Sequence, residues 1–428
     1  MLYPVPLRHS LICLSLCLLS ACADQPASQP SVAASATPAP STAVVTSQPS
    51  NTAQPRAQSF AQWLAQFRQQ ALAAGIQPAI FDQAFAGVSP DEAVIKADTS
   101  QPEFTRPVWE YLDGAISAAR VRRGQAMLGE HAATLAAIEQ AYGVDSQALV
   151  AIWGMESSFG QFTGDKSVIR SLASLAYEGR RPAFAQTQLL AALQILQHGD
   201  VPSSQLLGSW AGAMGQTQFI PSTYNHYAVD FDGDGRRNIW ASSADALASA
   251  ANYLHSSGWQ QGQPWGVEVA LPEGFDYALA DAEIRKPLSE WRTLGVKNLP
   301  LNFSEARASL LLPAGYRGPA FLALDNFRAI LKYNNSTSYA LAVGLLSERL
   351  LNGGQVLAKW PRDDLPLSRA QRIVLQEQLS SKGFNPGGVD GIIGANSRKA
   401  IRSYQQSLGW PADGYPNQAL LQKLISTL

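Results

Sequence analysis

DSQALVAIWGMESSFG, residues 145–160, is the stretch that decides the fold. Asp145 is a typical N-cap residue, and the apolar side chains after it predict a helix. Glu156 is the only charged residue in the rest of the stretch. It follows Trp153 by three residues and Ile152 by four, which places it on the apolar face of that helix. We therefore expect a buried helix with a carboxyl group in its last turn.

Two effects act on the carboxyl group of Glu156. Burial disfavours its charged form, and so does the partial negative charge at the end of a helix. Both raise its pKa, and a general acid for glycosidic cleavage has to be protonated near neutral pH. The position by itself favours slightly a structural Glu that is bonded to backbone or exposed at a frayed end, so the surrounding sequence decides between that role and catalysis.

A second stretch, SWAGAMGQTQFIPSTY at residues 209–224, is rich in small residues. Small residues let the backbone approach a ligand closely. Ser209 and Gln218 in it supply neutral hydrogen bonds of the kind that suit sugar hydroxyl and acetamido groups. A buried loop that packs helices together could also be rich in small residues, but the run Gln-Phe-Ile-Pro-Ser at its end does not suit such packing.

Helical periodicity dominates from Phe60 to about Leu350, and only residues 267–271 and 309–312 favour strands. These features predict an α+β fold that is mainly helical. Residues 360–366 have the composition of a short linker. Beyond it, a Ser cap at 368, the turn-rich run GGVDGIIG at 387–394 and two further helical patterns predict a small three-helix module.

The N-terminus has the features of an export signal. Arg8 and His9 precede an apolar run at residues 11–19, which is shorter than the roughly 20 residues that span a bilayer. All three Cys residues occur by position 22, so a processed chain would keep Cys22 alone, without a disulfide or a cysteine metal site. Residues 23–57 are almost uncharged and rich in Ala, Ser, Pro and Thr, which predicts a flexible tether. The net charge of −1 and the lack of a basic run argue against nucleic acid as a partner.

Glu156 with SSFG after it, the run AGAMGQTQFIPSTY and the run DFDGDG at 230–235 together resemble the membrane-bound lytic murein transglycosylase B family. Residues 366–428 resemble a three-helix peptidoglycan-binding domain. LSAC at residues 19–22 resembles a bacterial lipobox, and Ala23 after it favours the outer membrane by the same resemblance. The organisation implied is a lipoprotein signal peptide at 1–21, a lipid-anchored linker at 22–57, a lysozyme-like catalytic domain at 58–352, a linker at 353–365 and a peptidoglycan-binding domain at 366–428. The expected location is the periplasmic face of the outer membrane, with a soluble periplasmic protein as the alternative.

The resemblance implies that Glu156 acts as both acid and base on peptidoglycan, without a cofactor for the chemistry. It also implies a set of substrate-binding residues: Tyr111, Arg180, Arg181, Ser209, Gln218, Tyr253, Tyr333, Asn334 and Tyr339. Arginines suit this substrate because its peptide stems bear carboxylates. We find no second carboxylate motif near Glu156, whereas ordinary glycosidases need two carboxylates. In the resembled family the 6-hydroxyl of the cleaved muramic acid takes the place of the second group.

The run from Asp230 to Asn238 has the rhythm of an EF-hand loop, with oxygen ligands at positions 1, 3 and 5 and Gly at position 6. It departs from that pattern at position 12, where Ala241 replaces the usual Glu, and at position 8, where Arg237 replaces an aliphatic residue. The resembled family closes a longer loop on a later Asp, so the predicted ligands of one structural Ca²⁺ are Asp230, Asp232, Asp234, the carbonyl of Arg236, and Asp245. An Asp- and Gly-rich turn without a metal is the alternative.

Two other functions remain open at this point: a hydrolysing muramidase of the same fold, and a wall-binding lipoprotein without activity. The sequence contains no Gly-x-Ser-x-Gly motif, and its five His residues do not have the spacing of metal ligands. Serine hydrolases and metallohydrolases are therefore poorly supported. The sequence identifies no partner in a cell-wall synthesis complex.

Overall fold

The computed structural model describes residues 58–99 and 106–426, all within one compact unit, residues 57–428. The predicted signal peptide, Cys22 and the predicted tether to residue 57 lie outside the described residues.

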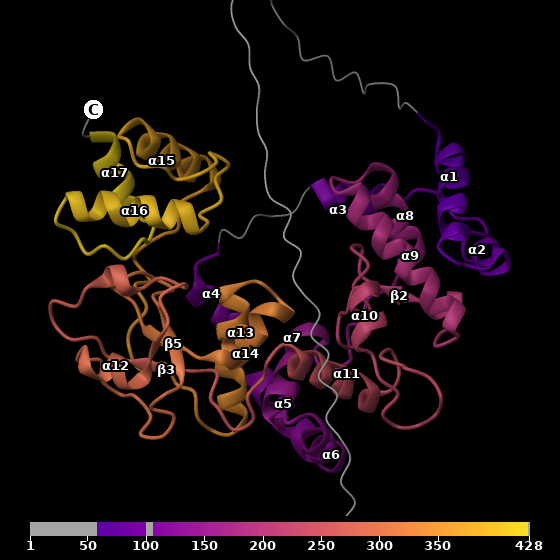
Figure 1. Ribbon diagram of the computed structural model, residues 1–428, viewed down its shortest axis with the longest axis horizontal. Coiled ribbons are helices and arrows are strands. Elements are labelled where there is room, and N and C mark those ends of the chain that lie inside the picture. Colours follow the sequence, from indigo (N-terminus) through magenta and orange to yellow (C-terminus); the bar gives the residue numbers. More distant parts are fainter. Residues whose placement is uncertain (1–57, 100–105, 427–428) are drawn as a thin grey trace, which may run out of the picture. The chain divides into compact units, whose positions relative to one another are not determined.

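Helices dominate the described chain, as expected (Figure 1). Before the C-terminal module they are α1 (Phe60–Ala73), α2 (Pro78–Ala84), α3 (Glu92–Thr99), α4 (Val108–Ala115), α5 (Ala118–Glu130), α6 (Ala132–Tyr142), α7 (Ser146–Ser157), α8 (Val168–Glu178), α9 (Pro182–His198), α10 (Pro221–Tyr227), α11 (Ser243–Ser256), α12 (Leu288–Thr293), α13 (Asp325–Tyr333) and α14 (Thr337–Leu350), with short 3₁₀ helices at Ser203–Gln205 and Tyr277–Leu279.

Helix α7, which covers most of the opening stretch, is the centre of the largest core. Leu149 and Ile152 are at most 1% exposed, and α5, α6, α11 and α14 pack around the helix. A helix that is apolar on nearly every face is stable only when it is surrounded in this way. Burial of the helix that carries Glu156, predicted from its composition, is therefore confirmed.

A second core joins the N-terminal helices to α8, α9 and α10. Helices α8 and α9 lie side by side (Figure 1). Beside them, strands β1 (Lys166–Ser167) and β2 (Leu207–Gly208) form a two-stranded antiparallel sheet that leads directly into Ser209. This short sheet positions the start of the small-residue loop.

The larger sheet is antiparallel in the order β3-β6-β5-β4. Its strands are β3 (Gly266–Val269), β4 (Lys286–Pro287), β5 (Arg307–Leu311) and β6 (Ala320–Ala323). The two predicted strands correspond to β3 and β5. The sequence did not reveal β6, because it is buried on both faces and lacks the alternation that marks a half-buried strand, and it did not reveal β4, which has only two residues.

The C-terminal module consists of α15 (Arg369–Ser381), α16 (Ala395–Ser407) and α17 (Gln418–Ser426), around a core of its own. Ser368 caps α15 as predicted, in a reciprocal capping box with Gln371. The three-helix prediction is confirmed.

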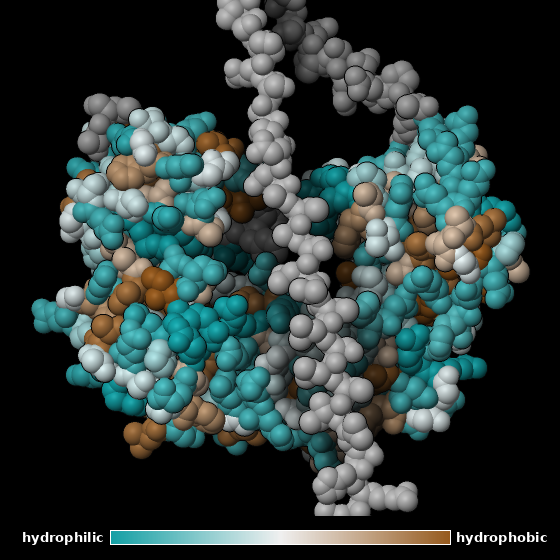
Figure 2. All heavy atoms as spheres, in the orientation of Figure 1, coloured by the Kyte–Doolittle hydropathy of each residue, from teal (hydrophilic) through white to brown (hydrophobic). Residues whose placement is uncertain are grey.

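Within residues 58–99 and 106–426, no helix is long and apolar enough to cross a bilayer. The face shown in Figure 2 mixes hydrophilic and hydrophobic residues without a continuous hydrophobic band.

Candidate active site

Glu156 is the last residue but one of α7, and a sharp backbone turn follows it. Ser158, Phe159 and Gly160 have φ angles of 50°, 62° and 79°, so three successive residues are left-handed. Two of them are not glycine, and such conformations cost about 1 kcal/mol or more each. The surrounding packing holds this turn, which ends the helix and leaves the Glu156 carboxyl partly accessible.

The start of α7 differs from the prediction in one respect. Asp145 occupies the N-cap position, but its side chain makes no capping hydrogen bond and instead accepts one from Trp259 Nε1 at 2.9 Å. Glu139 provides the hydrogen-bond acceptor at the start of the helix instead. Its carboxylate accepts the main-chain N–H of Ser146 at 3.0 Å and the hydroxyl of Ser146 at 2.6 Å. A partner from the preceding helix cannot be inferred from a local capping pattern.

Burial raises the pKa of Glu156 to about 7, and a hydrogen bond from Tyr339 opposes that rise. Tyr339 Oη donates to Glu156 Oε1 at 2.5 Å. The donor comes from α14, which packs against α7, so two neighbouring helices fix the geometry of this pair. A pKa near neutral lets the same carboxyl group donate a proton in one step and accept a proton in another.

Two other predicted tyrosines lie near this pair, and a third packs against one of them. The hydroxyls of Tyr111 and Tyr333 are near enough to Glu156 for its charge to raise their pKa, in addition to the larger effect of burial. The ring of Tyr253 lies edge-on to that of Tyr333, with centroids 5.1 Å apart. The structure therefore gathers Tyr111, Tyr333 and Tyr339 around Glu156 from three helices, and Tyr253 of α11 packs behind Tyr333.

Replacing Tyr339 with Phe should move the pH dependence of activity. The hydroxyl lowers the pKa of Glu156, so its loss leaves that pKa higher. A general acid works only while it is protonated, so the alkaline limb of kcat/KM should shift upward by roughly half a unit to one unit, the equivalent of one hydrogen bond. Rates of glycan cleavage measured from pH 5 to 9 would check this, and an alkaline limb that stays in place or moves to lower pH would contradict it.

Gln216 is a candidate positioning residue that the sequence patterns did not reveal. Its Oε1 accepts a hydrogen bond from Trp153 Nε1 at 2.9 Å, and its main-chain carbonyl accepts one from Ser157 Oγ at 2.8 Å. Trp153 and Ser157 flank Glu156 in α7, so Gln216 ties the small-residue loop to the end of the helix on both sides of the carboxyl group. The loop carries two Gln residues, and composition cannot tell which of them is buried.

Ser209 and Gln218 both lie in the small-residue loop, but each is engaged with backbone. Ser209 Oγ accepts the N–H groups of Ala211 and Ala213 at 3.2 and 3.1 Å. Gln218 is left-handed, with φ 51°, and its Nε2 donates to the carbonyls of Thr163 and Gly215 at 3.1 and 2.9 Å. These bonds fix the shape of the loop, and Tyr333 secures it to the tyrosines by donating to the carbonyl of Thr217 at 2.7 Å.

The two predicted arginines lie at the α8–α9 junction, away from the tyrosines. They line a cavity of about 390 Å³ together with Trp210 and Ala211, directly after Ser209. Arg180 pairs with Asp98 at 3.3 Å, while the Arg181 guanidinium covers the ring of Phe184 at 4.7 Å. Asn334, at the end of α13, is exposed, and no side-chain contact joins it to the cluster among the described residues.

The metal-like loop brings together three of its predicted ligands. Asp230, Asp232 and Asp245 each have a carboxylate oxygen within 4.8 Å of the others. Asp234 is outside this group, because its Oδ1 turns back to accept the N–H of Arg236 at 2.8 Å. Asp245 is fully buried and accepts three main-chain N–H groups of the loop.

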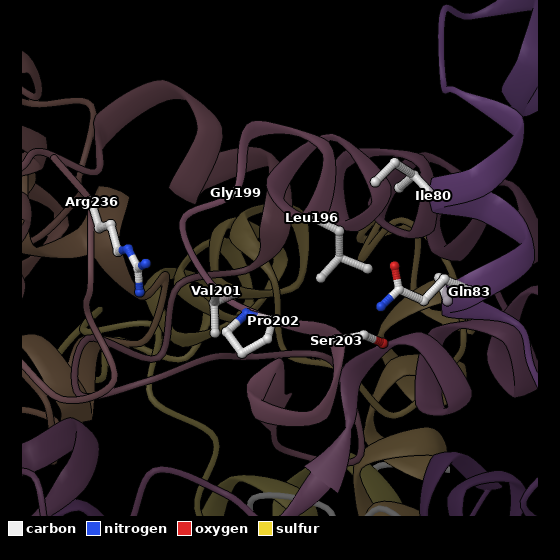
Figure 3. A pocket seen from close by; sticks show the side chains of 9 residues that line it. Ile80, Gln83, Leu196, Gly199, Val201, Pro202, Ser203 and Arg236 are labelled. Carbon is white, nitrogen blue, oxygen red and sulfur yellow. The ribbon is translucent and has the colours of Figure 1, made fainter.

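Both arginines of that loop point away from the carboxylates. Arg237, unexpected at its position, pairs with buried Asp200 at 2.7 Å and lies over the ring of Tyr224. The Arg236 side chain lines a separate cavity of about 300 Å³ beneath α2 and the end of α9; Figure 3 shows it across that cavity from Gln83. Only its main-chain carbonyl is therefore a candidate ligand.

Comparison with protein families gives two matches. Residues 59–348 match the family described as the transglycosylase SLT domain. Residues 368–424 match a putative peptidoglycan-binding domain. The first match covers more than half of the chain and includes every residue of the tyrosine cluster.

Three relatives indicate how close the similarity is. Membrane-bound lytic murein transglycosylase B of Escherichia coli K12 is 32% identical over 240 residues, which cover 54% of this chain and 64% of that protein. The crystal structure of SltB3 from Pseudomonas aeruginosa, in complex with NAG-anhNAM-pentapeptide, is 66% identical with a TM-score of 0.85 and covers 86% of this chain and all of its own. The Escherichia coli lytic transglycosylase Slt35 in complex with calcium is 29% identical with a TM-score of 0.59, over 68% of this chain and 92% of its own.

Proposed function

Since the chain belongs to the transglycosylase SLT domain family, we propose that it is a lytic murein transglycosylase with a single acid/base, Glu156. Its substrate is the β-1,4 bond between N-acetylmuramic acid and N-acetylglucosamine in peptidoglycan. Its product ends in 1,6-anhydro-N-acetylmuramic acid. Two relatives are named as lytic transglycosylases, and a third was solved with an anhydro-muropeptide bound.

The proposed reaction uses one carboxyl group twice. Protonated Glu156 donates its proton to the glycosidic oxygen as the bond to the anomeric carbon breaks, which releases the N-acetylglucosamine hydroxyl. As a carboxylate, Glu156 then takes the proton from the 6-hydroxyl of the same muramic acid while that oxygen bonds to the anomeric carbon. The proton returns to Glu156 and no water is consumed, so the reaction is balanced without a second catalytic carboxylate.

The observation that carries this proposal is the environment of Glu156. Burial raises its pKa and the hydrogen bond from Tyr339 lowers it, and among the described residues no hydrogen bond joins its carboxyl group to a second carboxylate. An ordinary glycosidase places its second carboxyl group within about 5–10 Å of the first. The residues around Glu156 are instead tyrosines, which can orient a sugar and exclude water but do not act as a second acid at neutral pH.

Mass spectrometry of digested peptidoglycan tests the proposal against a hydrolysing muramidase. We expect muropeptides that end in anhydro-muramic acid and are lighter by one water than the products of hydrolysis. Reducing ends would assign the chain to the muramidases. The absence of any cleavage would favour a wall-binding protein without activity.

Two regions outside the catalytic body have proposed supporting roles. The C-terminal module would hold the enzyme on the polymer and raise the local concentration of glycan. Lipidation at Cys22 would anchor the chain to the outer membrane on its periplasmic side; the support for this is the lipobox-like sequence and a relative described as membrane-bound.

The loop at 230–245 is the proposed site of one structural Ca²⁺. Its donors would be Asp230, Asp232 and Asp245 with the carbonyl of Arg236, a set of hard oxygen ligands that suits calcium. Main-chain N–H groups orient all three carboxylates. Asp230 accepts three of these groups at 2.8–3.1 Å, Asp245 accepts three, and Asp232 accepts one at 3.3 Å. A relative was solved in complex with calcium.

Calcium should therefore stabilise the protein. At a hundredfold excess over its dissociation constant the ion would add about 2.7 kcal/mol to the free energy of unfolding, and chelation would remove this contribution. Thermal unfolding with calcium and with a chelator would measure the difference, which should amount to a few degrees. The Asp230→Asn variant should not respond to calcium, and an equal response in that variant would place the ion elsewhere.

A further inference from the structure

We propose that Arg362, in the segment that joins the two matched domains, is a positioning residue for Tyr111 beside Glu156. The inference rests on the proposed function, and it makes the connecting segment part of the catalytic apparatus rather than a passive linker. We call residues 356–364 the strap.

The strap is attached to the large sheet along its first half. The carboxylate of Glu268 on β3 accepts the main-chain N–H groups of Leu357 and Ala358, both at 2.7 Å. Trp360 then packs against the largest core, with its ring stacked near that of Phe321 at a centroid distance of 6.5 Å. Main-chain hydrogen bonds and a partly buried ring together fix this stretch, so its next residues start from a defined position.

The second half of the strap is attached to α4. Arg362 donates two parallel hydrogen bonds to the carboxylate of Asp113, at 2.8 and 3.0 Å. One helical turn earlier, Trp109 meets Trp360 at 6.3 Å between ring centroids. Residues separated by four positions share a face of a helix, so one face of α4 is held by the strap at both of its turns.

Tyr111 lies on the same helix between these two contacts. Its side chain is half-buried against the largest core, and Glu156 is close enough to affect its hydroxyl electrostatically. Helix α4 packs on α14, which carries Tyr339. The two helices thus bring one tyrosine each to Glu156. The place of Tyr339 is fixed by its hydrogen bond to the carboxyl group, whereas no hydrogen bond of the Tyr111 hydroxyl is recorded within the described residues.

The geometry of Tyr111 therefore depends on how α4 is held. Helix α4 has only eight residues, and isolated helices of that length are unstable in water. Its position follows from its packing on α14 and from the strap. A shift of α4 by a fraction of an ångström would move Tyr111 relative to Glu156, and misplacement on this scale is enough to slow an enzyme.

The test uses the full-length protein and short soluble glycan fragments. Arg362→Ala should lower kcat/KM about fivefold, because loss of the ion pair with Asp113 frees one turn of α4 and allows Tyr111 to shift relative to Glu156. The melting temperature should change by at most about 2 °C. The matched control is Arg317→Ala, which removes the ion pair of the strap with Asp363 at 2.7 Å without touching α4 and should keep full activity.

Two further variants separate positioning from general stability. In a Tyr111→Phe background, Arg362→Ala should cause no additional loss, since both changes act through the same hydroxyl. The reversed pair Asp113→Arg with Arg362→Asp should restore at least half of the lost activity. Unchanged kcat/KM in Arg362→Ala, additive losses with Tyr111→Phe, or an equal loss in Arg317→Ala would each overturn the inference. Product identity, determined in the same digests, tests the proposed function separately from these rates.

Discussion

Replacing Glu156 with Gln should lower the rate of glycan cleavage by about a thousandfold or more. The amide keeps the size and shape of the carboxyl group but can neither donate its proton to the glycosidic oxygen nor receive one from the 6-hydroxyl. General acid–base catalysis contributes typically 10²- to 10⁴-fold, and in the proposed mechanism this one group supplies both the acid and the base. The variant should still bind peptidoglycan, because the tyrosines and the C-terminal module are unchanged.

The measurement is the release of muropeptides from purified peptidoglycan, followed by mass spectrometry. The hydroxyl of Tyr339 can donate to the amide oxygen of Gln, so the fold of the variant should be preserved and its melting temperature should stay close to that of the wild type. Lysis at more than about a tenth of the wild-type rate would mean that another group is the acid.

Glu348 provides the matched control. Like Glu156, it is a partly buried Glu. Burial raises its pKa, and one hydrogen bond from an aromatic side chain, here Trp265 Nε1 at 2.7 Å, lowers it. It lines a cavity of about 220 Å³ with Trp259 and Asp145, near the opposite end of α7 from Glu156. Glu348→Gln should retain activity within about twofold. This comparison separates a raised pKa, which both residues share, from placement among the tyrosines, which Glu156 alone has.

The sequence predicted those parts of the fold that depend on local pattern. The apolar stripe of α7 and the position of Glu156 in its last turn follow from the spacing of side chains along one helix, and the Ser368 cap follows from a local motif. Both are present in the structure. The resemblance to a known family then supplied the candidate residues on other helices, which no periodicity could have brought together.

The sequence did not predict contacts between residues that are distant along the chain. Gln216 reaches Trp153 across 63 positions and Arg362 reaches Asp113 across 249, and neither pair is marked by a pattern. Residues 360–366 have the composition of a short linker, yet Trp360 packs against the largest core. Composition indicates whether a segment has enough apolar side chains to be buried. It does not identify the surface against which a single aromatic side chain packs.

Gly164→Ala should lower the stability of the protein more than any other Gly→Ala substitution near the active site. Gly164 has a φ of +91°, and a Cβ built on it would lie 2.1 Å from the carbonyl carbon of Gly208. The left-handed backbone costs about 1–2 kcal/mol for Ala, and overpacking against a backbone atom costs typically 1–3 kcal/mol more. We expect the free energy of unfolding to fall by roughly 2–5 kcal/mol and the melting temperature by roughly 5 °C.

The same substitution should also reduce activity, because Gly164 and Gly208 lie at the base of the small-residue loop. Gly208 pairs with Lys166 across β1 and β2 and is followed directly by Ser209. Thr163, the residue before Gly164, accepts the hydrogen bond from Gln218. Separating the two glycine backbones displaces both ends of the loop at once, and displacements near 1 Å cost enzymes up to about a hundredfold in rate.

Gly199→Ala isolates the steric part of this prediction. Gly199 has nearly the same φ, +90°, but no atom lies within 4 Å of the position that its Cβ would take. It therefore carries the backbone cost without the clash and should lose only about 1–2 kcal/mol and no activity. If both variants lose equal stability, backbone strain alone accounts for the effect. If Gly164→Ala is the less stable of the two but cleaves glycan at the wild-type rate, the close contact between Gly164 and Gly208 is not needed to hold Ser209 and Gln218 in place.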